Sequence, residues 1–361
     1  ILKTSDILIG ETGWPSEGRM REDALPSKTN QAIFVREFVK LAEEKNWNYN
    51  IIEAFDQPWK RVSEGAVGGF WGLFDKDRLD KNVFTGDVSD FPNYKYLALG
   101  SLLLIFVFSF LLKNSNISTK RLVLFSFINT IFAVLYMLQM EQFNITVRSS
   151  GEVVWATLVL LTHLAIYYFV LLNIVKESKP KIVGIREILT NKIFNVDTLP
   201  MILFYSSFIF VLISTIILAF EGRYRNFEIY IFAISAISFV LLYGGRFVNM
   251  EFKAFEKLSF IVLLITSIIS FYNEGSLNIF SNIWIIIALI FTYILFQGSK
   301  NSSFSELKII AKYIAIFFIF SISLRYGIIA DKDIIAQCHL NDDTLLCGFK
   351  NQVGYLGYIG V

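Results

Sequence analysis

Long apolar stretches, separated by short polar loops, make up most of the chain from Tyr96 onward. An α-helix needs about 20 apolar residues to cross the hydrocarbon core of a bilayer. The pattern predicts eight spans: Tyr96–Leu112, Leu122–Leu138, Val153–Val175, Met201–Phe220, Ile229–Phe247, Leu258–Tyr272, Ile279–Phe296 and Ile309–Leu324. Several of these are short, and Leu258–Tyr272 is the weakest. A buried core helix would explain one such stretch, but it is a poor explanation for eight in succession.

Residues 1–90 show a different pattern, in which two short β-prone runs flank a helical one. Ser5–Gly10 predicts a buried strand that is followed at once by Glu11. Thr29–Asn46 predicts an amphipathic helix, and Tyr49–Phe55 predicts a second strand that includes Glu53. The helix would be capped by Ser27 or Thr29, and its apolar face would hold Ile33, Phe34, Phe38, Leu41 and Ala42. Strand, helix and strand form one parallel unit, as at the active-site edge of an α/β barrel, so Glu11 and Glu53 should face one cleft.

Composition supports the membrane interpretation and excludes some classes of partner. Apolar residues make up 54% of the chain and charged residues only 18%, whereas a soluble domain carries about a quarter charged residues. A formal net charge of +2 is too small to indicate binding to nucleic acid. The apolar composition makes the lipid bilayer the expected partner.

The loops between the predicted spans differ in their basic residues, which sets the expected orientation. Alternate loops, the first included, hold Lys113, Lys120, Arg121, Lys176, Lys179, Lys181, Arg186, Lys192, Lys253, Lys257, Lys300 and Lys308, with Arg246 at a border. The other loops hold Arg148, Arg223 and Arg225. We therefore expect the first set to be cytoplasmic, with the N-terminal part and the C-terminal tail on the other side. Cys338 and Cys347 lie in that tail, where an oxidising compartment favours a disulfide over two free thiols.

The predicted cleft combines carboxylates with aromatic side chains. Glu11 and Glu53 are surrounded in sequence by Trp14, Trp59, Phe70 and Trp71. Glycoside hydrolysis needs two carboxyl groups around an oxocarbenium-like transition state. The pattern therefore favours sugar chemistry, although the tryptophans would also suit a protein core or a membrane interface.

Three motifs in this region resemble glycoside hydrolase family 17, the β-1,3-glucanases. ETGWPSEG at Glu11–Gly18 is similar to the signature around the family's nucleophile. IIEAFDQPWK at Ile51–Lys60 and EGAVGGFWGLFD at Glu64–Asp75 resemble the last barrel strand and closing segment of bacterial members. In those members the domain is fused to a multi-span membrane region. The resemblance covers Ile7–Asp75; over the membrane part it concerns architecture alone.

The resemblance implies roles for individual residues. Glu11 would be the nucleophile, Glu53 and Lys60 would position the sugar, and Trp14, Trp59 and Trp71 would line subsites. The family's acid/base glutamate lies in an Asn-Glu pair on an earlier barrel strand. No such pair precedes the first predicted span, and Asn273-Glu274 sits in a membrane loop. We therefore expect a C-terminal fragment that lacks the acid/base half of its site and is inactive alone.

The resemblance also implies an organisation and a location. Residues 1–90 would be the last two β/α units of a (β/α)8 (TIM) barrel, residues 96–324 a helical membrane bundle, and residues 325–361 an extracytoplasmic tail. The location would be a bacterial inner membrane, with the soluble part and the tail in the periplasm.

The expected function is that of a membrane-anchored retaining glycosidase or glucosyltransferase acting on β-1,3-glucan. Hydrolysis and transfer share one glycosyl-enzyme intermediate, so the sequence leaves that choice open. The alternatives are a glucan-export or assembly module with a sugar-binding barrel remnant, and a truncated inactive product. We expect neither a cofactor nor a metal, because a phosphate-binding glycine loop and metal-ligand spacings are lacking, which also disfavours a nucleotide-dependent synthase. Protein partners leave no trace in the sequence.

Overall fold

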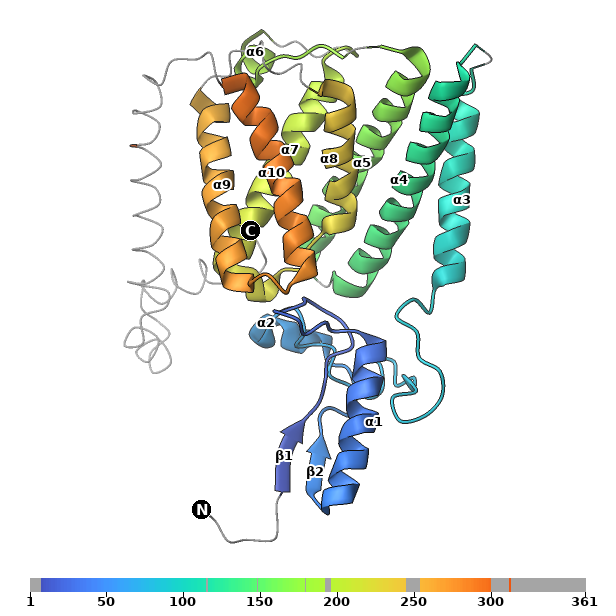
Figure 1. Cartoon of the computed structure of the whole chain (residues 1–361), viewed down its shortest axis with the longest axis vertical. Coiled ribbons are helices and arrows are strands. Elements are labelled where there is room, and N and C mark those ends of the chain that lie inside the picture. Colours follow the sequence, from blue (N-terminus) through green and yellow to red (C-terminus); the bar gives the residue numbers. More distant parts are fainter. Residues whose placement is uncertain are drawn as a thin grey trace.

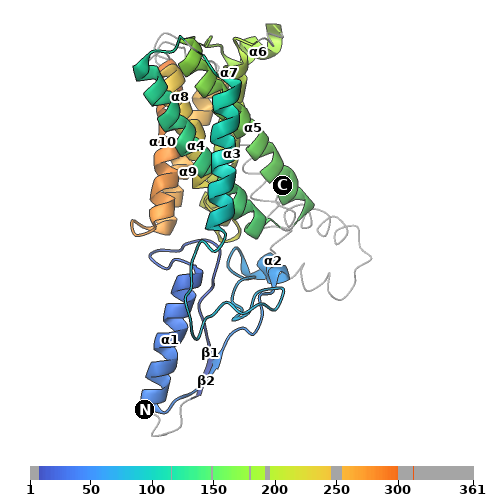
Figure 2. The same cartoon turned by 90° about the vertical axis from the view of Figure 1, so that its right-hand side faces the viewer.

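The protein, seen here in a computed structural model, consists of a small N-terminal segment and a helical bundle (Figure 1). The structure describes residues 8–299 except residues 115, 148, 179, 192–195 and 245–253, together with residue 312. The N-terminal segment comprises residues 8–93, and the bundle begins at residue 94. The segment lies against one end of the bundle, which both views show (Figures 1 and 2).

The N-terminal segment contains a two-stranded parallel sheet. Its elements are β1 (Leu8–Thr12), α1 (Lys28–Lys45), β2 (Asn48–Ile51), the 3₁₀ turn η1 (Pro58–Lys60) and α2 (Arg61–Glu64). Leu8 pairs with Asn48 and Ile9 with Tyr49, so the two strands end at the same edge. The predicted parallel strand–helix–strand unit is therefore confirmed, whereas the predicted burial of its strands is wrong, because no residue of β1 or β2 is buried. The sheet has two strands among the described residues, and its membership of a barrel stays a prediction.

The second strand is shorter than expected, because its continuation pairs with another segment. β2 ends at Ile51 rather than at Phe55. Beyond it, the Glu53 N–H donates to the Trp71 carbonyl over 2.9 Å, and the Leu73 N–H donates to the Glu53 carbonyl over 2.8 Å. The loop after β2 is thus held by residues 71–74.

Helix α1 begins and ends where its capping residues predict. The Ser27 side chain accepts a hydrogen bond of 3.1 Å from the Asn30 N–H, and Asn46 ends the helix with a left-handed φ of 51°. The predicted apolar face was partly wrong, since Ile33 is 48% and Leu41 is 42% exposed. The buried positions are Gln31, Ala32, Val35 and Ala42. The buried face is rotated because the helix packs under the segment around Trp71 and Gly72, to which Gln31 donates hydrogen bonds.

The bundle contains seven long or medium-length apolar helices and one short polar one among the described residues. They are α3 (Tyr94–Leu111), α4 (Thr119–Thr146), α5 (Ser150–Lys176), α6 (Ile185–Asn191), α7 (Leu199–Glu221), α8 (Ile229–Tyr243), α9 (Ala254–Glu274) and α10 (Ile279–Ser299). Six of them are long and apolar enough to cross a membrane; α8 is shorter, and α6 has only 7 residues. The eighth predicted span, Ile309–Leu324, lies outside the described residues, so the total of eight stays a prediction.

Polar side chains join the helices inside the bundle. The Tyr167 hydroxyl donates to the Asn129 carbonyl over 2.7 Å, and the Trp284 indole donates to the Thr215 hydroxyl over 3.1 Å. The buried His163 contacts the Ser207 hydroxyl at 3.3 Å. Such hydrogen bonds link helices where lipid gives no hydrophobic driving force between them. His163 therefore links α5 to α7.

Helix α3 stands at the edge of the bundle, packed on α4 (Figure 1). Only 11% of the residues of α3 are buried, and most of its large apolar side chains are exposed. Because these side chains are apolar over the whole helix, a lipid environment satisfies them where water would not. This helix also follows directly on the N-terminal segment and ties it to the bundle.

Candidate active site

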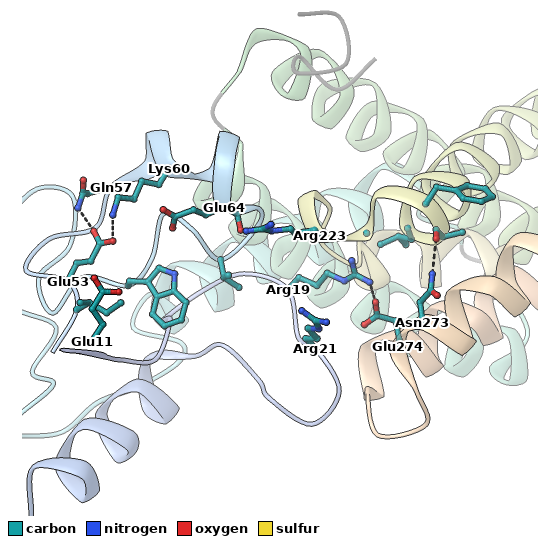
Figure 3. Close-up of a pocket in the computed structure, with 17 residues that line it drawn as sticks. Glu11, Arg19, Arg21, Glu53, Gln57, Lys60, Glu64, Arg223, Asn273 and Glu274 are labelled. Carbon is teal, nitrogen blue, oxygen red and sulfur yellow. Dashed lines mark hydrogen bonds and ion pairs between the residues drawn. The ribbon is translucent and has the colours of Figure 1, made fainter. Parts of the chain in front are cut away.

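A cleft of about 1170 Å³ lies between the N-terminal segment and the facing ends of α7 and α9 (Figure 3). The wall from the N-terminal segment includes Glu11, Ile52, Glu53, Gln57, Lys60, Glu64, Val67 and Trp71. The wall from the bundle includes Leu218, Ala219, Phe220, Gly222, Arg223, Asn273 and Glu274. Arg19 and Arg21, from the loop between β1 and α1, lie at the junction of the two walls.

Glu11 reaches the cleft from the end of β1. It is an exposed residue next to Thr12, whose carbonyl accepts a hydrogen bond of 2.8 Å from the Ile52 N–H. Gly13 follows, and a Cβ there would lie 2.4 Å from the Ile52 carbonyl oxygen. The close approach of the segments at Gly13 and Ile52 therefore needs glycine. It brings Glu11 alongside the loop that carries Glu53.

Glu53 is held by two donors from its own loop. Its carboxylate accepts hydrogen bonds from the Gln57 amide and the Lys60 ammonium group. The side chains of Lys60 and Glu53 are 21% and 15% exposed, so the pair is partly shielded from water. The hydrogen bond that Lys60 donates to Glu53 raises the pKa of Lys60, and the negative charges of Glu64 and Glu11 add to this. Lys60 therefore remains a cation beside Glu53 and Glu11, two of the carboxylates of the cleft.

Trp71 is fixed through its backbone and that of its neighbour. Gln31 of α1 donates a hydrogen bond of 3.0 Å to the Gly72 carbonyl. The Gly72 N–H donates to Asp56 over 2.9 Å, and a Cβ at this glycine would lie 2.1 Å from the Asp56 backbone nitrogen. The backbone next to Trp71 is thus anchored by contacts on both sides.

A buried lysine under the cleft connects three parts of the segment. The Lys81 ammonium group donates to the Ser16 hydroxyl (2.8 Å), Asp56 (2.7 Å) and the Gly72 carbonyl (2.8 Å). Burial lowers the pKa of Lys81, and the charge of Asp56 opposes that shift. Sequence reasoning missed this network because Lys81 lies outside the three motifs, although Ser16 and Asp56 lie within them.

Another carboxyl group of the first motif is buried beside this network. Desolvation raises the pKa of Glu17 to about 7, and the positive charges of Lys28 and Lys81 moderate the rise. Glu17 is not among the residues that line the cleft. Its carboxyl group therefore affects the stability of the motif rather than contacting a ligand there.

The structure brings together four of the six predicted site residues. Glu11, Glu53, Lys60 and Trp71 line one cleft. Trp14 points elsewhere: its indole donates to the Leu25 carbonyl over 3.0 Å, and its ring lies 5.6 Å from that of Phe34. Trp59 is 66% exposed and outside the cleft lining. The predicted subsite roles of these two tryptophans therefore gain no support from the geometry.

Two other sequence predictions meet the structure differently. Cys338 and Cys347 lie outside the described residues. The Asn-Glu pair at Asn273 and Glu274 lies in the cleft wall, although it belongs to α9. Glu274 forms an ion pair with Arg19 and accepts a hydrogen bond of 2.8 Å from Asn278, so its carboxylate is already engaged. Among the described residues, no group of three or more His, Cys, Asp or Glu side chains could hold a metal ion.

Comparison with known proteins identifies the origin of this segment. Residues 1–72 match the family model of the BtgE/BtgC glycoside hydrolase domain. The N-terminal segment is glycoside hydrolase-like. Glu11, Glu53, Lys60 and Trp71 all lie within the matched residues.

Named relatives agree with the family model over the same region. The chain is 39% identical over 70 residues to a glucan 1,3-beta-glucosidase of Saccharomyces cerevisiae, a match that covers 18% of this chain and 22% of the relative. It is 33% identical over 75 residues to a glucan 1,3-beta-glucosidase of Candida albicans, covering 20% and 24%. A probable family 17 glucosidase of Saccharomyces cerevisiae is 32% identical over 72 residues, covering 20% and 18%. The chain thus spans less than a quarter of the length of these relatives. No solved structure matches it.

Proposed function

We propose that the protein is a membrane-anchored retaining glycosidase or glucosyltransferase that acts on β-1,3-glucan, with Glu11 as its nucleophile. The observation that carries the proposal is the position of Glu11 within the matched residues and at the wall of a large cleft. The names of the relatives support glucan as the substrate class. The parallel strand–helix–strand unit also fits two β/α units of a TIM barrel, whose strands end at the catalytic face.

In the proposed reaction the Glu11 carboxylate attacks the anomeric carbon and forms a covalent glycosyl-enzyme intermediate. Lys60 stays cationic and holds Glu53 in place, so Glu53 acts as a hydrogen-bond acceptor for sugar hydroxyls. The Glu53 carboxylate is engaged by Lys60 and Gln57, and the Glu274 carboxylate is engaged by Arg19 and Asn278. We therefore assign the general acid to the family's Asn-Glu pair on an earlier strand, and to none of the described residues.

The proposed location follows from the charges at the two ends of the bundle. The N-terminal segment contacts residues at the ends of α4, α7 and α9, such as Thr146, Arg223 and Glu274. The opposite ends carry the loops that are rich in lysine and arginine, which indicates the cytoplasmic side. We propose that the cleft faces the periplasm of a bacterial cell, with residues 1–90 as the hydrolase part, 96–324 as the membrane part and 325–361 as an extracytoplasmic tail.

One observation counts against the alternative of a glucan conduit through the bundle. The rings of Phe204, Phe208, Phe239 and Phe291 pack together, with centroids 4.9–6.5 Å apart for the contacting pairs. All four side chains are buried. An aromatic core of this density fills the space that a sugar chain would need between α7, α8 and α10.

The test is Glu11→Gln in the full-length protein, with Glu37→Gln on the exposed face of α1 as the matched control. We expect Glu11→Gln to lower kcat on laminarioligosaccharides by at least about 1000-fold, because removal of a nucleophile affects the transition state directly. Membrane insertion and thermal stability should not change. A 2-fluoroglucoside should label Glu11, and mass spectrometry would locate it. Substantial activity of Glu11→Gln, or label on another residue, would overturn the assignment.

A further inference from the structure

The N-terminal segment is fixed to the bundle by a buried polar contact at the end of α9. Arg19 and Glu274 form an ion pair in which both side chains are 8% exposed. The Arg19 guanidinium also lies 4.9 Å from the centre of the Phe227 ring. The Asn278 amide donates to the Met20 carbonyl over 2.8 Å. These contacts join the loop after β1 to two turns of the bundle.

A second contact joins α2 to the turn after α7. The Ala66 N–H donates to the Arg223 carbonyl over 2.8 Å, and the Arg223 side chain donates to the Glu64 carbonyl over 3.1 Å. The segments that contain Gly65 and Arg223 approach so closely that a Cβ at Gly65 would lie 2.5 Å from the Arg223 carbonyl oxygen. A Cβ at Gly222 would likewise lie 2.1 Å from the Arg19 guanidinium. The helix ends are therefore a fixed wall of the cleft.

This wall and the adjoining loop after β1 present polar groups beside an aromatic side chain. Arg21 is exposed, and its guanidinium has no hydrogen-bond or ion-pair partner among the described residues. The Asn273 amide donates to the Ala219 carbonyl, and its own oxygen has no partner in the described part of the chain. Phe220 is 50% exposed at the same wall. Donors and an acceptor around an exposed ring suit a sugar, which has hydroxyls at its rim and apolar faces.

The charges of the cleft indicate an uncharged ligand. Its lining holds four carboxylates, Glu11, Glu53, Glu64 and Glu274, and four cations, Arg19, Arg21, Lys60 and Arg223. These charges cancel, so the cleft as a whole does not select an anion. Its volume of about 1170 Å³ exceeds the range of about 300–1000 Å³ that is usual for small-molecule sites. A neutral oligosaccharide longer than a few units fits both properties.

We propose that the bundle itself forms part of the glucan site: Asn273 and Phe220 at the ends of α9 and α7, together with Arg21 from the adjoining loop after β1, bind the sugar units that extend from the reaction centre toward the membrane. This inference rests on the proposed function and adds a subsite to it. The N-terminal segment performs the chemistry at Glu11, and the ends of α7 and α9 bind the chain farther along. Short substrates that end before this wall do not contact it.

The test compares substrates of increasing length in the full-length protein. Phe220→Ala removes a group of the bundle wall, and Arg21→Ala removes one of the loop that adjoins it. Arg186→Ala on α6 and Phe106→Ala on α3 are matched controls, since both residues are exposed and lie outside the cleft. We expect the two cleft variants to lower kcat/KM about tenfold for the longest laminarioligosaccharides. The shortest cleavable substrate should change less than about twofold, and the controls should match the wild type.

A binding measurement makes the result independent of turnover. Calorimetry in the Glu11→Gln background should show weaker binding of long laminarioligosaccharides when Phe220→Ala is added, and unchanged binding of short ones. Equal loss at every length, or no loss at any length, overturns the subsite. Activity that survives Glu11→Gln would instead overturn the proposed nucleophile, so the two failures are distinguishable.

Discussion

Arg19 in the loop after β1 and Glu274 at the end of α9 form a buried ion pair across 255 positions of sequence. Burial lowers the pKa of Arg19, whereas the negative charge of Glu274 and its hydrogen bond raise it. The carboxylate of Glu274 therefore offsets the cost of removing the Arg19 cation from water. The pair fastens the glycoside hydrolase-like segment to the bundle.

Glu274→Gln should weaken this attachment strongly. Removing one partner of a buried ion pair leaves an uncompensated charge and costs about 3–5 kcal/mol. Asp77→Asn is the matched control, because Asp77 pairs with Lys76 on the surface, where both are 63% exposed, and such pairs contribute about 0–1 kcal/mol. Urea unfolding in detergent would measure both. Equal effects of the two substitutions would contradict the importance of the buried pair.

The buried Glu17 should make stability depend on pH. Its pKa rises from 4.5 to about 7 on folding, so the folded state binds a proton that the unfolded state has released between these values. The contribution of this protonation to the free energy of unfolding is therefore fully present below about pH 4.5, and it is lost as the pH rises toward 7, by on the order of 3 kcal/mol. Glu17→Gln should flatten this slope and stabilise the protein above pH 7. Thermal unfolding from pH 4 to 8 would test it, with the exposed Glu37→Gln as control; an unchanged slope would refute it.

Gly72→Ala should disturb the cleft, whereas Gly10→Ala should not. A Cβ at Gly72 would lie 2.1 Å from the Asp56 nitrogen, and backbone atoms there cannot move aside cheaply. A Cβ at Gly10 meets no atom within 4 Å. Overpacking costs about 1–3 kcal/mol or more, and it should displace Trp71. Thermal stability and Trp fluorescence of the two variants would show the difference, and identical behaviour would disprove the close packing.

Glu53→Gln should change the alkaline limb of activity. The hydrogen bond that Lys60 donates to Glu53 is the main cause of the raised pKa of Lys60, so neutralisation of Glu53 lowers that pKa. Because Lys60 lies beside the carboxylates of the cleft, the alkaline limb of kcat/KM should move to lower pH. Lys76 also pairs with an acid, but on the surface, and Asp77→Asn should leave the profile unchanged. An unaltered profile for Glu53→Gln would show that the charge of Lys60 has no part in the reaction.

Sequence reasoning located the elements well, because their signals are local. The first seven predicted spans each overlap a helix, and Ser27 caps α1 as predicted. Glu11 and Glu53 meet at one edge because a parallel unit requires it. Periodicity alone did not show which face of α1 is buried, since that depends on the distant segment at Trp71 and Gly72.

The second wall of the cleft could not be predicted in the same way. Arg21, Phe220 and Asn273 come from a loop and from the ends of two helices of the bundle, and no shared motif links them. Their proximity depends on packing between residues more than 200 positions apart. The solitary Asn-Glu pair at Asn273 was visible in the sequence, but its place beside the cleft was not.

The attachment of the N-terminal segment at two places has a mechanical consequence. The chain enters the bundle through α3 at one edge, while Arg19 is fastened at α9 in another part of it (Figure 1). Because the N-terminal segment is attached at two separated points, it cannot rotate about either one relative to the bundle. In a bilayer, Glu11 would therefore keep a constant height above the lipid surface. Only polymer that lies within this thin layer would be cut or extended, and chains farther from the membrane would be left intact.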